Sequence, residues 1–120
     1  MKKLSCLLVL AMMTSPAWAD CTYPKKPAKM PDGKSATRDE MIGAQKVVKT
    51  YQTDMSNYLT CLKTEHDASI AKDAATLTDA QKQTMNTRFT QRNDAAVDEE
   101  QEVAERFNEQ LRAFKAKDSK

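Results

Sequence analysis

The chain has 120 residues, of which 30% are charged, with 19 lysines and arginines against 17 aspartates and glutamates. Two of the lysines belong to an N-terminal segment that we expect to be removed, which leaves 17 residues of each sign. A chain without net charge shows no electrostatic signature of nucleic-acid binding. Two glycines and one histidine cannot supply a glycine-rich phosphate loop or a serine–histidine–acid set. We therefore do not expect an enzyme.

The first 19 residues are typical of a secretory signal peptide. Lys2 and Lys3 precede an apolar run over residues 4–13, and the triplet Ala17-Trp18-Ala19 is a cleavage site. We predict cleavage after Ala19 and export to the periplasm or to the outside of a bacterial cell. The apolar run is too short for a permanent span and no later run approaches membrane length, so we expect no stable membrane insertion of the processed chain.

Removal of the signal peptide leaves two cysteines, Cys21 and Cys61. An even pair in an exported chain indicates a disulfide, and we predict a bridge between these two residues. Two free or intermolecular thiols are the alternative. A metal site would need more ligands at closer spacing, and a redox site would need Cys-x-x-Cys. Lipid attachment at Cys21 would need a small residue before it, where the chain has Asp20.

Residues 20–36 form an arm that is rich in proline and lysine and that cannot be helical. Residues 20–38 hold five basic and two acidic residues. Their charge is opposite to that of an acidic belt near the C-terminus, which we interpret as a solvated surface. The belt consists of Asp94, Asp98, Glu99, Glu100, Glu102 and Glu105. We expect the arm and the belt either to attract each other or to meet separate partners.

A first helix is predicted over residues 37–72. Thr37 and Glu40 form a capping box at its start. Apolar residues follow at alternating spacings of three and four, which place them on one stripe. The stripe consists of Met41, Ala44, Val48, Tyr51, Met55, Tyr58 and Leu62, and Val47, Leu59 and His66 widen it.

A second helix is predicted over residues 78–117, before a loose tail at 118–120. Thr78 and Gln81 form its capping box. Its apolar stripe consists of Met85, Phe89, Ala96, Val103, Phe107 and Phe114, with Leu111 at the flank. The link at 73–77 has no strong helix breaker, so one continuous helix is the alternative.

Together these elements predict an all-α fold, a long antiparallel, coiled-coil-like hairpin with an extended N-terminal arm pinned by the disulfide. One contact between two helices is a thin core, which dimerisation into a four-helix bundle would deepen. The arm can reach Cys61, because it spans roughly 50 Å as a polyproline-like chain and Cys61 lies roughly 36 Å along the first helix. We expect the arm to turn near Pro31-Asp32-Gly33 or Ser35 and to run back along that helix. Gly43 either lets the arm's backbone pass closely or is incidental.

His66 is the only histidine and lies between Glu65 and Asp67. Consecutive helical residues point about 100° apart, so these three side chains cannot converge on one metal ion. We therefore expect His66 at the edge of the contact between the helices, where it could respond to pH. Most methionines of the processed chain lie on the apolar stripes, which favours core packing over copper or haem ligation. We predict no metal and no cofactor.

Residues 77–85, LTDAQKQTM, resemble the LTxxQ motif of the periplasmic Spy and CpxP chaperone family. Members of that family are small, exported, all-helical proteins that bind unfolded clients on the concave face of a cradle-shaped dimer. The family usually carries the motif twice, and the arm and the disulfide are not expected of it. Residues 21–62, with their Pro-Asp-Gly, capping box, Tyr51, Tyr58 and Cys61, are also similar to uncharacterised small exported proteins of Gram-negative bacteria, a resemblance that implies no activity.

The sequence predicts a non-catalytic, exported helical binding protein of the bacterial envelope, either chaperone-like or an adaptor. This prediction depends on two amphipathic stripes that occur without catalytic groups. The alternative is a structural or spacer protein of the periplasm that acts through oligomerisation. The expected partners are a client protein or a second copy in a homodimer, and not nucleic acid.

Overall fold

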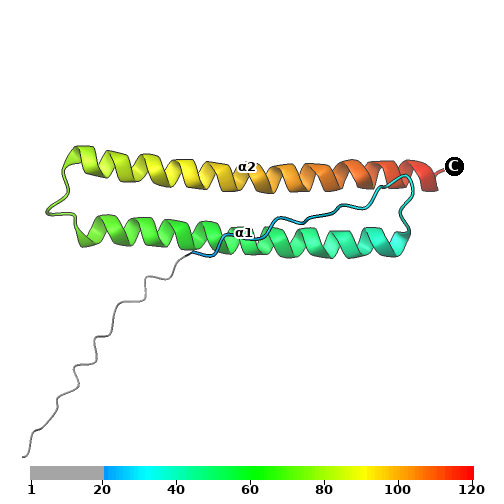
Figure 1. Cartoon of the computed structure of the whole chain (residues 1–120), viewed down its shortest axis with the longest axis horizontal. Coiled ribbons are helices and arrows are strands. Elements are labelled where there is room, and N and C mark those ends of the chain that lie inside the picture. The colour runs from blue at the N-terminus through cyan, green and yellow to red at the C-terminus, as the bar shows by residue number, and fades with distance from the viewer. Residues whose placement is uncertain (1–20) are drawn as a thin grey trace, which may run out of the picture.

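The computed structural model describes residues 21–120, and this part of the chain contains two helices and no strand (Figure 1). Helix α1 spans Arg38–Lys72 and helix α2 spans Asp79–Asp118, and the two run antiparallel beside the extended arm. The predicted all-α hairpin with an N-terminal arm is confirmed, and the alternative of one continuous helix is wrong. The predicted signal peptide with its cleavage after Ala19, and Asp20 at the start of the arm, lie outside the described residues.

Both helices begin at the predicted capping boxes. The backbone N–H of Glu40 donates to Thr37 Oγ1 at 3.3 Å, and the Glu40 carboxylate accepts from the Thr37 backbone N–H at 2.7 Å. Thr78 and Gln81 repeat this exchange at 3.2 and 2.8 Å. Each box satisfies backbone donors that the first helical turn leaves without a partner.

Helix α1 ends where the chain reverses through the turn at residues 73–76. The backbone N–H groups of Thr76 and Leu77 both donate to the carbonyl oxygen of Asp73, at 2.9 Å each. These bonds close the turn in place of helical ones, so α2 can restart at Thr78 in the opposite direction. The link therefore reverses the chain although it contains neither proline nor glycine.

The two apolar stripes meet along one seam between α1 and α2. Its buried residues are Met41, Val48, Tyr51, Met55, Tyr58 and Leu62 of α1 and Ala96, Val103 and Phe107 of α2, together with Ala36 before α1. Ala44 and Leu59 are half-buried, as are Phe89, Leu111 and Phe114. The prediction that Val47 belongs to this contact is wrong, because its side chain is 52% exposed. Two helices bury only a narrow stripe, and Val47 lies about 100° around α1 from Val48.

The arm lies over the seam and contacts both helices, whereas the sequence predicts a path along α1. At its start, the ring of Tyr23 meets the ring of Tyr58 on α1 edge to face, with centroids 4.9 Å apart. Further along, Lys26 Nζ lies 2.8 Å from a carboxylate oxygen of Glu102 on α2. The arm is thus a third layer of the core and not only a tether.

The arm reverses at residues 33–35, within the predicted region, and then enters α1. The backbone N–H groups of Ser35 and Ala36 donate to the carbonyl oxygen of Asp32, at 3.0 and 2.7 Å. Lys117 Nζ, in the last turn of α2, donates to the carbonyl oxygen of Ala36 at 2.6 Å. The end of α2 therefore holds the turn against the start of α1.

Gly33, and not Gly43, is the glycine at which two backbones approach closely. A Cβ atom added at Gly33 would lie 1.9 Å from the backbone oxygen of Gln110 on α2, and one added at Gly43 would have nothing within 4 Å. Neither glycine has a positive φ, so the requirement at Gly33 is for space. Of the two alternatives for Gly43, the close approach is wrong and the incidental glycine is supported, because that residue lies on the exposed side of α1.

Candidate functional site

The disulfide between Cys21 and Cys61 divides the hairpin into two parts. The two Cα atoms are 5.7 Å apart and the bridge is present as predicted, which is typical of an oxidising compartment. From this point the arm covers the seam towards the start of α1 (Figure 1). We call residues 38–61 and 93–118 the covered part, and residues 62–92 the open end.

At the open end, no segment within residues 21–120 covers the seam (Figure 1). Leu62, which is 2% exposed, is the last buried residue on α1. Beyond it, the apolar and aromatic residues of the seam are only half-buried, and they are His66, Ile70, Leu77, Met85 and Phe89. The open end therefore presents an apolar surface that a bound molecule could cover.

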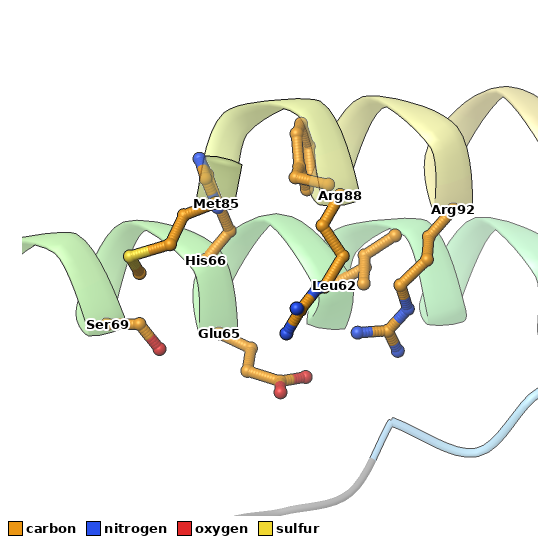
Figure 2. A pocket seen from close by; sticks show the side chains of 8 residues that line it. Leu62, Glu65, His66, Ser69, Met85, Arg88 and Arg92 are labelled. Carbon is orange, nitrogen blue, oxygen red and sulfur yellow. The ribbon is translucent and has the colours of Figure 1, made fainter. Parts of the chain in front are cut away.

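A cleft of about 160 Å³ opens in this surface between the two helices (Figure 2). Its lining is Leu62, Glu65, His66 and Ser69 of α1 and Met85, Arg88, Phe89 and Arg92 of α2. The volume equals that of about five water molecules at their share of liquid volume. Because cofactor and drug-sized ligand pockets run from about 300 to 1,000 Å³, the cleft suits one side chain better than a cofactor.

The inner wall of the cleft is a stacked pair of rings from the two helices. The imidazole of His66 lies parallel to the ring of Phe89, with centroids 4.5 Å apart and an interplanar angle of 16°. Met85 lies one turn before Phe89 on the same face of α2, and Leu62 lies one turn before His66 on α1. His66 is half-buried at the edge of the seam, where the sequence predicts it.

The mouth of the cleft carries two arginines from one face of α2. Arg88 and Arg92 are one helical turn apart, and both side chains extend across the seam to the side on which Glu65 and Ser69 lie (Figure 2). Arg92 Nη2 donates to the hydroxyl of Tyr58 at 3.4 Å. Within the described part of the chain, neither guanidinium forms an ion pair.

Glu65 contacts the disulfide and, among the described residues, forms no ion pair with these arginines. One of its carboxylate oxygens lies 3.3 Å from Cys21 Sγ. Because a disulfide sulfur carries no hydrogen, this contact is not a hydrogen bond. Arg88 and Arg92 were not predicted as a site from the sequence, although their spacing of four, next to Met85 and Phe89 on the stripe, is a signal that could have identified them.

Two residues of the acidic belt, Glu99 and Glu102, contact α1 and the arm. Tyr51 donates from its hydroxyl to Glu99 at 2.6 Å, and burial and this carboxylate raise the pKa of Tyr51. The ammonium of Lys26 lowers the pKa of Glu102, whose carboxylate it contacts. Of the two expectations for the arm and the belt, mutual attraction is the one that the Lys26–Glu102 contact supports.

No three histidine, cysteine, aspartate or glutamate side chains within residues 21–120 are grouped so that they could hold a metal ion. Neither of the two helices is long and apolar enough to cross a membrane. Comparison of the chain with known protein families, with curated proteins and with solved structures finds no match. The site must therefore be interpreted from its own geometry.

Proposed function

We propose that this chain is a non-catalytic binding protein of the bacterial envelope that holds segments of other proteins at its open end. One observation carries the proposal: on α1 the seam is buried as far as Leu62 and is only half-buried beyond it. A disulfide that pins the arm suits an oxidising compartment, which the predicted signal peptide would reach. Apolar surface left open on a pinned scaffold favours binding of a partner.

The chemistry of the cleft favours binding over catalysis. Nucleophilic catalysis needs a nucleophile within hydrogen-bond reach of a base. His66 stacks on Phe89 and, among the described residues, makes no hydrogen bond to Ser69 or to Glu65. The cleft therefore supplies apolar walls and positive charge without an activated group.

The motif at residues 77–81, on which the resemblance to the Spy and CpxP chaperones rests, lies at the tip of the open end. Thr78 and Gln81 of this motif cap α2, and Leu77 is half-buried beside them. The motif thus combines a structural role with a position on the proposed binding surface. This position supports a chaperone-like protein within the general proposal.

The proposal is tested by the aggregation of a heat-denatured client such as citrate synthase, followed by light scattering. We expect the purified, disulfide-bonded protein to suppress scattering at stoichiometric excess. Phe89→Ser should abolish most of this effect, because it removes the largest apolar side chain of the open end. Val47→Ser is the matched control, since Val47 is an exposed apolar residue of the covered part. Scattering that the wild-type protein leaves unchanged would contradict the chaperone-like function.

The shape of the hairpin supports a second candidate, a spacer that acts through oligomerisation. Helix α2 has 40 residues, which corresponds to roughly 60 Å at 1.5 Å per residue. Two copies joined at their open ends would bury both exposed seams and form a longer rod. Sedimentation velocity measures this directly: a dimer that Phe89→Ser dissociates is expected for a spacer, and a monomer at all concentrations would contradict it.

A further inference from the structure

We propose that the cleft at the open end binds a carboxylate that stands next to an apolar side chain, in an acidic segment of a client protein. The inference rests on the proposed function and names the chemistry of its partner. The carboxylate would face Arg88 and Arg92 at the mouth, and the apolar side chain would enter the cleft against Met85 and Phe89.

The two arginines at the mouth form no ion pair in the part of the chain that the structure describes. Arg88 and Arg92 occupy positions i and i+4 of α2, where two like charges repel each other. Both guanidinium groups reach over the same cleft (Figure 2), and the one carboxylate in its lining, that of Glu65, contacts the disulfide and forms an ion pair with neither of them. A bound anion would relieve this repulsion and accept the free guanidinium donors.

The size and charge of the cleft select one carboxylate over other anions. Arginine matches the planar geometry of a carboxylate with two parallel hydrogen bonds. Glu65 at the rim adds one negative charge, which disfavours a dianionic phosphate more than a singly charged carboxylate. The volume of about 160 Å³ leaves room for one neighbouring side chain. A short acidic and apolar peptide therefore fits better than a free inorganic anion.

The test uses the purified, disulfide-bonded protein and three peptides, with affinity from calorimetry and location from amide shifts in NMR spectra. The first probe is N-acetyl-Leu-Glu-Phe-amide, and the second replaces its glutamate with glutamine. The third, N-acetyl-Leu-Phe with a free C-terminus, offers the carboxylate of a chain end. We expect the glutamate peptide to bind about tenfold more tightly than the glutamine peptide. Binding of the third peptide with similar affinity would assign the site to chain ends as well as to acidic side chains.

Variants separate the arginines from the general charge of the helix. The double change Arg88→Gln and Arg92→Gln should remove the preference for glutamate. Arg112→Gln, an exposed arginine on the same helix outside the open end, is the matched control and should bind like the wild type. Helical circular dichroism should be unchanged in both proteins, because the exchanged side chains are exposed.

The outcomes distinguish this inference from the function on which it rests. Equal binding of the glutamate and glutamine peptides at the open end would overturn the carboxylate preference and leave the proposed function standing. A clear preference for the glutamate peptide without suppression of client aggregation would support the carboxylate preference and overturn the proposed function. Equal shifts caused by sodium acetate alone would overturn the requirement for an apolar neighbour. Shifts of the same amides with protein concentration alone would show that a second copy fills the cleft, and would overturn the inference.

Discussion

The covered part and the open end are built from the same two helices and continue the same apolar stripes, yet they differ in burial. Met55 in the covered part is fully buried, with 0% exposure, whereas Met85 at the open end is half-buried. The difference is the arm, whose described part adds a third layer over the seam from the Cys21–Cys61 bridge to the start of α1. Two helices alone bury a narrow stripe, so a third element decides where the hairpin has a core and where its seam stays partly exposed.

The largest expected effect on stability comes from releasing the arm from α1 by removing the disulfide. Cys61→Ser opens a loop between residues separated by 40 positions, and loss of such a closure costs about 4 kcal/mol in the chain-entropy model. For a domain of this size, that loss lowers the melting temperature by more than about 10 °C. Calorimetry of the variant, and of the wild type with reductant, measures the effect, and an unchanged melting temperature would refute the role of the disulfide as an anchor.

Met55 and Met85 allow the covered part and the open end to be compared through one side chain in each. Met55→Ala should reduce the free energy of unfolding by about 3 kcal/mol, because it leaves a cavity in a buried site. Met85→Ala should reduce it by about 1 kcal/mol or less, because solvent already reaches this side chain. Urea denaturation of both variants gives the two values. Equal losses would mean that the arm does not make the covered part the core of the hairpin.

The two glycines test the contact of the arm with α2. Gly33→Ala should destabilise the protein by about 2 kcal/mol, since the added methyl group would collide with the backbone of α2 at Gln110. Gly43→Ala should stabilise it by about 0.5 to 1 kcal/mol, because alanine favours the helix and meets no neighbour. Chemical denaturation measures both changes. If Gly43→Ala destabilises the protein and Gly33→Ala does not, the close approach lies at Gly43 and the described contact of Gly33 with α2 is contradicted.

The smallest effect concerns the bond between Tyr51 and Glu99 in the covered part. Burial and Glu99 raise the pKa of Tyr51, so the folded chain keeps a proton that the unfolded chain loses above about pH 10. This contribution to stability is therefore fully present below that pH and is lost as the pH rises further. Tyr51→Phe should lower the free energy of unfolding by about 1 kcal/mol at neutral pH. It should also make the decrease in stability above about pH 10 smaller than in the wild type.

Unfolding by denaturant at pH 7 and at pH 11 measures how much stability the wild type and Tyr51→Phe each lose at alkaline pH. The pKa of Tyr23 is also raised, by burial and by Glu99, so a smaller alkaline slope should remain in the variant. Identical pH dependence of the wild type and Tyr51→Phe would contradict the role of this hydrogen bond. Because no corresponding buried tyrosine lies on the described residues of the open end, the effect reports on the covered part alone.

Features that depend on local chemistry could be predicted from the sequence. The capping boxes at Thr37 and Thr78 mark both helix starts through contacts within four residues, and the stripe spacing identifies the faces that meet. The two cysteines that remain after the predicted signal peptide were enough to predict the bridge between Cys21 and Cys61. These predictions needed no knowledge of how the arm lies across the helices.

Features that depend on the third layer could not be predicted in the same way. The close approach at Gly33 follows from the path of the arm, which the sequence does not specify. The exposure of Val47 follows from the narrow width of the stripe that two helices bury. Arg88 and Arg92 resemble ordinary surface charges until the seam between the helices is known to open beside them. The close approach at Gly33 and the missed arginines therefore both depend on how the described part of the arm lies over the seam.

Hydrogen exchange along the two helices, followed by mass spectrometry, tests most directly whether the arm divides the hairpin into a core and an open surface. In the oxidised protein we predict slower exchange of backbone amides at residues 41–61 and 96–111 than at residues 66–89. Reduction of the disulfide should release the arm and remove most of this difference. Uniform protection along the oxidised hairpin, or a difference that reduction leaves unchanged, would contradict the account.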